Sequence, residues 1–513
     1  MKRYLLCIFA SLTMLAGAAN AQVVLGPNGP ENAEAKIPAP ALDGTPSRAP
    51  DRAKVFELRL HPAAEPAPAL KHHLIPQYLE RKPGNAAPYY YRAILAYKGV
   101  QTQLKDQKLW EDYERWIETP LKELPRQEIR GRLRHFHRAF ENLEIAAYRE
   151  HCEWDWRLQD LQGNDVIAFL LEEIQESRGL ARLLSLKVRL QIAEKKYEEA
   201  ILTIRTGYQF ARDVAKPRTL INSLVGIAIV ELLNEQLREL MTAPESPNLY
   251  WALAEVADSY IDMLPAMSHE MSTPLLMYPF LKDAETAQRT PEQWRQLMTE
   301  MVSEISNLSG DGLLKGGAKQ SNLLAAAAVT AMMLKDYSRV KKELIDSGVS
   351  RERLENMPVA QAVAIHQRRT YQYMYHEVFK WQMAPYHLAR KHAEASMERL
   401  RKQGYFSPGG KGEVFPLCQL LLPAAMNARY AEVRLNARIA ALQIVEAIRA
   451  HAANHDGQLP KTLVDIELPV RNNPLTGKPF PYRLEGETAV LEAPQGEGGS
   501  PENLWRLKMT IVK

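Results

Sequence analysis

Residues 438–494 read RIAALQIVEAIRAHAANHDGQLPKTLVDIELPVRNNPLTGKPFPYRLEGETAVLEAP. Apolar side chains recur every three or four positions in the first part, which is the spacing of one face of a helix. Gly457, followed by a proline, is a typical helix stop. The Glu485–Gly486 turn predicts a hairpin between strands near 480–484 and 488–491. Two short strands are marginally stable alone, so we expect the hairpin to pack on the helix.

Upstream of this stretch the helical spacing dominates most of the chain, and strand-like alternation is nearly absent. A representative helix face consists of Leu133, Phe136, Phe140, Leu143 and Ala147. The sequence therefore predicts a mainly α fold. We expect an irregular helical array or solenoid, followed by a small C-terminal α+β hairpin module.

A helical hairpin is predicted in the middle of the chain, at 186–215, which reads LKVRLQIAEKKYEEAILTIRTGYQFARDVA. Tyr197 falls at the corner, and small residues such as Gly207 follow along the second helix. This pattern resembles the tetratricopeptide repeat, in which small residues let two helices approach closely. The resemblance implies repeat-like hairpins near 180–264. An ordinary pair of antiparallel helices is the alternative.

The first residues have the form of an export signal. Lys2 and Arg3 precede an apolar run over 4–15, and Ala19-Asn20-Ala21 forms a signal-peptidase site before Gln22. The apolar run is too short for a permanent membrane span of roughly 30 Å. We expect a cleaved signal over 1–21 and a secreted or periplasmic protein. An uncleaved N-terminal anchor is the alternative.

Three further segments are expected after the signal: a Pro/Ala-rich flexible leader over 22–54, the helical array over 55–430, and the long helix with its β module over 431–513. Residues 504–512 are available as a third strand of that module. We expect no transmembrane span once the signal is removed.

Charge argues against a nucleic-acid partner. The formal net charge of +4 falls to +2 when Lys2 and Arg3 leave with the signal, and acidic and basic residues are interspersed. A nucleic-acid surface requires basic residues clustered on one face. Two cysteines, Cys152 and Cys418, remain after cleavage. An oxidising compartment permits a bridge between them, and two separate buried thiols are the alternative.

A polar stripe is the first candidate site. His137, Glu141, Glu144 and His151 fall at i, i+4, i+7 and i+14 of a helix expected from Arg126 to about Cys152. Imidazoles and carboxylates in such a row could bind a metal or share a proton. The row spans some 20 Å, and the HExxH and ExxH spacings of helical metal sites do not occur in the chain. We therefore expect no metal and no cofactor here.

The second candidate lies in the aromatic segment 365–392, which reads IHQRRTYQYMYHEVFKWQMAPYHLARKH. We expect the proline within it to bend the helix. Apolar and charged residues mix at Glu377, Phe379, Lys380 and Trp381. Such a mixture is typical of a contact surface, and these four residues are the predicted binding surface.

Several blocks resemble a family of uncharacterised, secreted, helix-rich proteins of planctomycete bacteria. The blocks are LRLHPAAEPAPAL, CEWDW, ARLLSLKVRLQIAEKKYEEA, LINSLVGIAI, PNLYWAL, FKWQMAPY, LLLPAAMNARYAEVRLNARIAALQIVEAIR and HDGQLPKTL with NPLTGKPFPYRLEG. The resemblance implies export and a shared fold, and it implies no particular activity. Residues 438–494 also resemble the C-terminal half of type II secretion pseudopilins, without a prepilin leader or an apolar spine helix.

These features predict an exported helical-repeat protein that binds protein or peptide partners in the cell envelope as a scaffold. An envelope hydrolase using histidines and carboxylates of 135–151 or 366–392 is the alternative. A purely structural envelope component is a third possibility, which the sequence separates poorly from the first.

Overall fold

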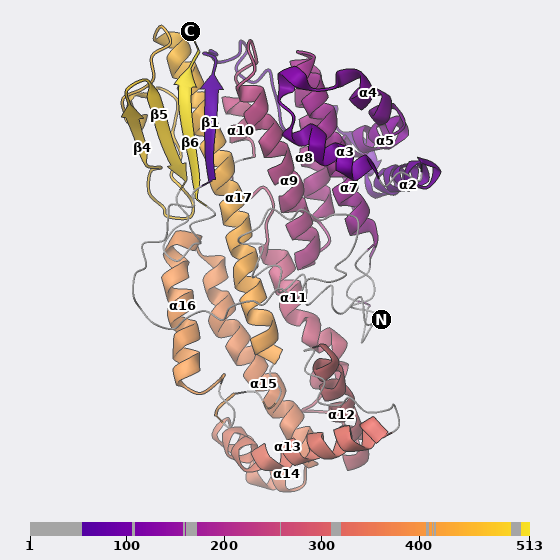
Figure 1. Cartoon of the computed structure of the whole chain (residues 1–513). Coiled ribbons are helices and arrows are strands. Elements are labelled where there is room, and N and C mark those ends of the chain that lie inside the picture. The colour runs from indigo at the N-terminus through magenta and orange to yellow at the C-terminus, as the bar shows by residue number, and fades with distance from the viewer. Residues whose placement is uncertain are drawn as a thin grey trace.

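A computed structural model describes residues 54–104, 108–156, 160, 172–256, 258–308, 320–406, 410–412, 414, 417–493 and 504–512. Helices dominate these residues (Figure 1), and the strands form two small sheets. The predicted fold class, mainly α with a small C-terminal strand module, is confirmed. The expected signal over 1–21 and nearly all of the expected leader lie outside the described residues.

The elements follow one another along the chain. The helices are α2 (Ala87–Leu104), α3 (Lys108–Glu118), α4 (Arg126–Arg134), α5 (His137–Ala147), α7 (Glu172–Ala193), α8 (Tyr197–Val214), α9 (Leu220–Met241), α10 (Tyr250–Ala254), α11 (Leu264–Met277), α12 (Pro291–Leu308), α13 (Gln320–Asp346), α14 (Arg351–Glu355), α15 (Val359–Phe379), α16 (Tyr386–Lys402) and α17 (Leu417–Asn454). The 3₁₀ turns are η1 (Tyr78–Glu80), η2 (Leu121–Glu123), η4 (Pro279–Leu281), η5 (Lys380–Met383) and η6 (Leu463–Asp465). The strands are β1 (Lys54–Leu60), β2 (Lys82–Asn85), β3 (Arg149–His151), β4 (Tyr482–Glu485), β5 (Thr488–Ala493) and β6 (Trp505–Ile511).

Helices α7, α8 and α9 pack against one another and form the centre of the array. The α7–α8 hairpin turns just before Tyr197, as the sequence predicts. Gly207 and Gly226 permit the close contact of α8 with α9, because an added Cβ would lie 2.6 Å from Leu233 Cδ1 and 2.7 Å from the Ala211 carbonyl oxygen, respectively. After α9 comes α10, a helix of only five residues. The predicted helical hairpin at 186–215 is therefore present as α7 and α8, and a tetratricopeptide arrangement is not confirmed.

Helix α17 is the axis of the molecule, and it contacts α9, α10, α11, α15 and β5 (Figure 1). It ends at Asn454, where Gly457 adopts a left-handed φ of +75° and its N–H donates to the Ala452 carbonyl oxygen at 2.8 Å. The predicted helix stop is confirmed. The helix begins at Leu417, so it runs across the boundary that we expected at 430/431.

The larger sheet has the strand order β1-β6-β5-β4. The β4–β5 hairpin and the third strand β6 agree with the sequence prediction. Strand β1 pairs in parallel with β6, which places residues 54–60 in the C-terminal module rather than in the helical array. We expected 55–430 to be the array, and this assignment was wrong for the first strand. Its apolar alternation, with Leu58 and Leu60 buried, suits a sheet that is covered on one face.

A buried ion pair connects the sheet to the array. Arg449 and Glu446 of α17 have fully buried side chains, 2.8 Å apart. Arg449 also donates to the main-chain oxygens of His61 (3.0 Å), Ser246 (2.9 Å) and Pro247 (3.3 Å). One guanidinium thus fixes α17 to the exit of β1 and to the loop after α9.

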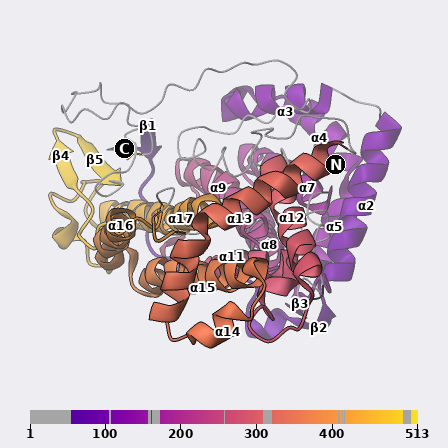
Figure 2. The same ribbon diagram turned by 90° about the horizontal axis from the view of Figure 1, so that it is seen from below.

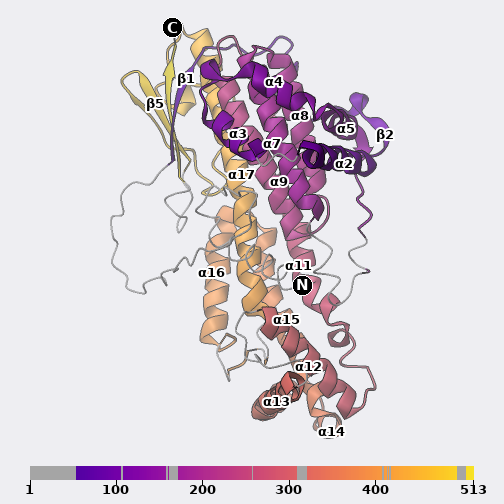
Figure 3. The ribbon, with the colours of Figure 1, turned by 45° about the vertical axis from the view of Figure 1, so that its right-hand side comes forward.

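The molecule is elongated, with the larger sheet at one end and α12, α13 and α14 at the other (Figures 1 and 3). Viewed from below, α13 crosses the ends of other helices (Figure 2). Among the described helices, α9 alone is long and apolar enough to cross a membrane, and 67% of its most apolar window is buried within the protein.

Candidate functional site

The predicted polar stripe does not lie on one helix. The expected helix from Arg126 to about Cys152 is interrupted at Phe136, and α5 ends at Ala147. His151 lies on β3, where it is paired with Asn85 of β2. The strand pairing removes His151 from the helical row, so the prediction of one continuous stripe was wrong.

The other stripe residues have separate, exposed surroundings. His137 Nδ1 lies 3.0 Å from the Arg134 carbonyl oxygen, and Glu144 accepts a hydrogen bond from Lys187 at 2.9 Å. Glu141 is exposed. The structure describes all four predicted residues, and no hydrogen bond or ion pair joins any two of them. Within the described ranges, no three His, Cys, Asp or Glu side chains are arranged to hold a metal ion.

The histidines of 366–392 also have different surroundings. His366 is buried, with its Nε2 2.6 Å from Glu343 Oε2 of α13. His387 lies against Gly477, and the His392 ring stacks on Trp381 with centroids 4.8 Å apart. His376 is exposed beside Tyr375. The described contacts thus bring no two of these histidines together around a carboxylate.

The predicted contact surface at 377–381 forms a corner between α15 and α16. Phe379 is only 9% exposed and belongs to the core, so it is not a surface residue. The Glu377 carboxylate forms ion pairs with Lys380 (2.8 Å) and Arg399 (3.4 Å). Trp381 is half-buried, and its indole N–H donates to Ser396 at 2.8 Å. The exposed apolar side chains at this corner are Met383 (71%) and Leu388 (61%).

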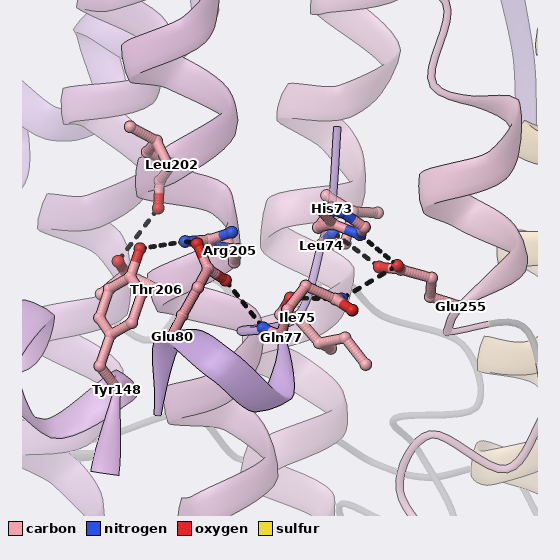
Figure 4. A network of polar contacts seen from close by, with 10 residues as sticks. All are labelled: His73, Leu74, Ile75, Gln77, Glu80, Tyr148, Leu202, Arg205, Thr206 and Glu255. Carbon is pink, nitrogen blue, oxygen red and sulfur yellow. Dashed lines mark hydrogen bonds and ion pairs between the residues drawn. The ribbon is translucent and has the colours of Figure 1, made fainter. Parts of the chain in front are cut away.

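A segment that was not predicted as a site makes a connected set of polar contacts with neighbouring helices. Residues 71–80 lie across α8 and the end of α10 and finish in the 3₁₀ turn η1 (Figure 4). His72 is 5% exposed, with its Nδ1 3.4 Å from Glu198. Burial lowers the pKa of His72, and the Glu198 carboxylate opposes that change. The segment is thereby fixed to the helix surface.

Glu255, at the end of α10, holds one side of this segment. Its Oε1 lies 2.5 Å from His73 Nδ1 and accepts from Gln77 Nε2 at 3.2 Å. Its Oε2 accepts from the Leu74 N–H at 3.2 Å. One carboxylate therefore fixes three successive parts of the segment, as the dashed lines in Figure 4 show.

Glu80 holds the other side. It accepts from the Gln77 N–H at 2.8 Å and from Arg205 of α8 at 2.9 Å, and Arg205 also donates to the Tyr148 hydroxyl (Figure 4). Burial raises the pKa of Glu80, but the hydrogen bonds from Gln77 and Arg205 outweigh it and hold that pKa below its usual value. Glu80 is thus held as an ionised, doubly hydrogen-bonded carboxylate.

Two large apolar side chains project from the turn between these anchors. Tyr78 is 86% exposed and Leu79 is 93% exposed. We call this pair the Tyr78–Leu79 platform. Large apolar side chains that are exposed on a fixed backbone are typical of contact sites rather than of folding cores. A similar turn, η6, carries Val464 at 91% exposure and has the same reciprocal capping box, here between Thr462 and Asp465.

The sequence carries a local signal for the turn that bears the platform. The spacing Gln77-x-x-Glu80 after Pro76 has the form of a capping box, which indicates a helical turn. Its contacts with Arg205 and Glu255 join residues more than a hundred positions apart in the chain, and a single sequence does not reveal them.

No protein-family model matches this chain, and no curated protein or solved structure matches it.

Proposed function

We propose that this protein is an exported helical scaffold that binds a protein or peptide partner in the cell envelope through the Tyr78–Leu79 platform. Export is inferred from the signal-like residues 1–21 of the sequence. The observation that supports the binding role is the combination of 86% and 93% exposure with anchored neighbours on both sides.

Anchoring matters because ordering a loop during association costs free energy. A rotamer-rich side chain that becomes fixed costs about 0.5–1.5 kcal/mol, and a turn that is already fixed avoids much of the backbone cost. Full burial of an apolar side chain of this size contributes about 1.5–3 kcal/mol. Tyr78 and Leu79 together are therefore able to act as the centre of a small interface.

The hydrolase alternative has no observation in its favour. The histidines of 135–151 and 366–392 contact different partners, as described above. A surface hollow of about 540 Å³ is lined by Glu111, Glu114, Arg115, Glu118 and Thr119, and it contains none of those histidines. We therefore retain the scaffold as the proposed function.

Site-specific photo-crosslinking tests this proposal. A benzophenone amino acid replaces Leu79 in one variant and Val464 in a matched control, because both residues are exposed and lie on capped 3₁₀ turns. We expect a discrete adduct from position 79 in cell-envelope fractions, absent from position 464 and lost when Tyr78→Ser is added. Equal labelling from both positions, or no adduct from position 79, would refute the platform as the contact site.

Export has its own test, which leaves the platform untouched. We expect the protein in the periplasmic or secreted fraction, with a mature N-terminus at Gln22 by N-terminal sequencing. A cytoplasmic protein that retains Lys2 and Arg3 would contradict the export part of the proposal.

A further inference from the structure

Three arginines lie together beside the larger sheet, at the end where β1 and β6 begin. Arg238 belongs to α9, and Arg434 and Arg438 lie one turn apart on α17. We call these residues the arginine cluster. The packing of α9 against α17 brings the two helices together at this point.

Aromatic rings from the sheet hold two of the guanidiniums. Arg238 Cζ lies 3.9 Å from the Phe56 ring centroid and 5.7 Å from that of Trp505. Arg438 Cζ lies 4.4 Å from the same Trp505 ring. Phe56 and Trp505 are themselves in edge contact, with centroids 5.1 Å apart. Stacking on a ring orients a guanidinium and leaves its N–H edge available for hydrogen bonds.

The N–H groups of the cluster are incompletely matched by acceptors. Arg438 pairs with Glu231 at 2.6 Å, whereas Arg238 and Arg434 make no ion pair within 4.0 Å among the described residues. Arg238 Nη1, Arg434 Nε and Arg438 Nε are buried without a hydrogen-bond acceptor. A buried donor without an acceptor loses its hydrogen bonds to water without replacement, and the loss is greater when the group is charged. Three guanidinium N–H groups of the cluster therefore lack an acceptor, while Glu231 Oε1 and Glu239 Oε2 are also buried without a hydrogen-bond donor.

The local charge is also unbalanced. Burial lowers the pKa of Arg238 and of Arg434, and the charge of Arg438 lowers both further. Glu239 is already paired with Arg189. Five cationic groups in this region face three carboxylates, which leaves an excess of two positive charges: Lys54, Arg189, Arg238, Arg434 and Arg438 against Glu231, Glu235 and Glu239.

The cluster can be reached from solvent. The Arg438 side chain is 17% exposed, and Lys54, which begins β1, is 39% exposed. Tyr430 lies one turn before Arg434, whose Cζ is 5.8 Å from the Tyr430 ring, and its buried hydroxyl has no hydrogen-bond partner among the described residues. A hydroxyl and two guanidiniums at successive turns of α17 thus present donors along one stripe.

We propose that the arginine cluster binds a doubly charged oxyanion of the phosphate class. Guanidinium groups match the tetrahedral oxygens of phosphate in paired, charge-assisted hydrogen bonds. Two negative charges neutralise the local excess, and the oxygens supply the missing acceptors. A dicarboxylate offers related chemistry, so the experiment separates the two.

Isothermal titration calorimetry with inorganic phosphate tests the proposal, at constant ionic strength maintained with chloride. We expect one saturable site per chain in the unmodified protein. The affinity is expected to fall at least about tenfold in Arg434→Gln and in Arg238→Gln, which corresponds to about 1.4 kcal/mol. Arg92→Gln is the matched control, because Arg92 also lies over an aromatic ring, that of Tyr89, but far from the cluster in the sequence.

Arg434→Lys keeps the charge and serves as a second variant if a glutamine variant fails to fold. We expect it to bind phosphate more weakly than the unmodified protein, because an ammonium group lacks the guanidinium fork. Absence of saturable phosphate binding, equal affinity in Arg434→Lys and Arg434→Gln compared with the unmodified protein, or binding of succinate in place of phosphate would overturn the proposal.

Discussion

We predict that Glu270 on α11 makes the free energy of unfolding depend on pH near neutrality. Its carboxylate is half-buried against the start of α9, where it accepts a hydrogen bond from the Leu220 N–H. Burial raises the pKa of Glu270 from 4.5 to about 7, and the hydrogen bond from Leu220 only partly offsets this. Desolvation therefore outweighs the favourable helix N-terminus.

The sign of the effect follows from proton linkage. Between pH 4.5 and about 7 the folded protein retains a proton on Glu270 that the unfolded chain has released. The free energy of unfolding therefore falls as the pH rises through this range. At 1.36 kcal/mol per unit of pKa the full effect is roughly 3.4 kcal/mol. Because Glu270 retains partial contact with water, we expect about 1–2 kcal/mol.

Glu270→Gln removes this titration and keeps an oxygen that can accept from Leu220. We expect the variant to match the unmodified protein at pH 4.5 and to be about 1–2 kcal/mol more stable at pH 8. Urea unfolding followed by circular dichroism at the two pH values measures the difference. Glu300→Gln, on an exposed position of α12, is the control and should show no such change. Identical gains at both pH values would refute the reasoning.

Three further predictions concern the core. Arg449→Met leaves the Glu446 carboxylate buried without its partner, so we expect a loss of about 3–5 kcal/mol in urea unfolding, most of which Glu446→Leu should restore in the double variant. Gly226→Ala should cost about 2–3 kcal/mol, and Gly207→Ala only about 1 kcal/mol. The added Cβ of the first would meet a main-chain oxygen at 2.7 Å, whereas that of the second would meet the end of the Leu233 side chain; thermal melting of both variants should show this order. Cys152 is a buried free thiol whose pKa burial raises, so in a Cys418→Ser background we expect Ellman's reagent to modify it at least about tenfold more slowly in the folded protein than in urea. Equal rates in the two states would contradict its burial.

The sequence predicted best those features that depend on neighbouring residues. The stop of α17 at Asn454 follows from Gly457. The β4–β5 hairpin follows from the turn predicted at Glu485–Gly486, which lies one residue later, at Gly486 and Glu487. The partner of β1 could not be inferred in this way, because Phe56 and Leu507 are adjacent in the sheet but lie at opposite ends of the chain. The alternation of Phe56, Leu58 and Leu60 was a usable strand signal, which the dominant helical spacing hid.

The candidate sites show the same difference between features set by neighbouring residues and features set by residues distant in the sequence. The stripe from His137 to His151 was predicted from helical spacing alone, and the pairing of β3 with β2 displaced its final member. The contact surface predicted at 377–381 lies at the corner between α15 and α16, and its member Phe379 turns inward. The Tyr78–Leu79 platform depends on Glu255 and Arg205, which reach it from helices distant in the sequence. The Gln77-x-x-Glu80 spacing indicates the turn locally, whereas the contacts that fix the turn join residues distant in the sequence.

The parallel pairing of β1 with β6 has a consequence for the order in which the chain acquires its structure. Synthesis proceeds from the N-terminus, so β1 is made before every described helix, and its partner strand β6 is made after all of them. An unpaired strand is a template for aggregation. Closing so long a loop also slows folding, because its entropy is lost before the strand contacts form. The larger sheet can therefore form completely only after all the described helices and β6 have been synthesised.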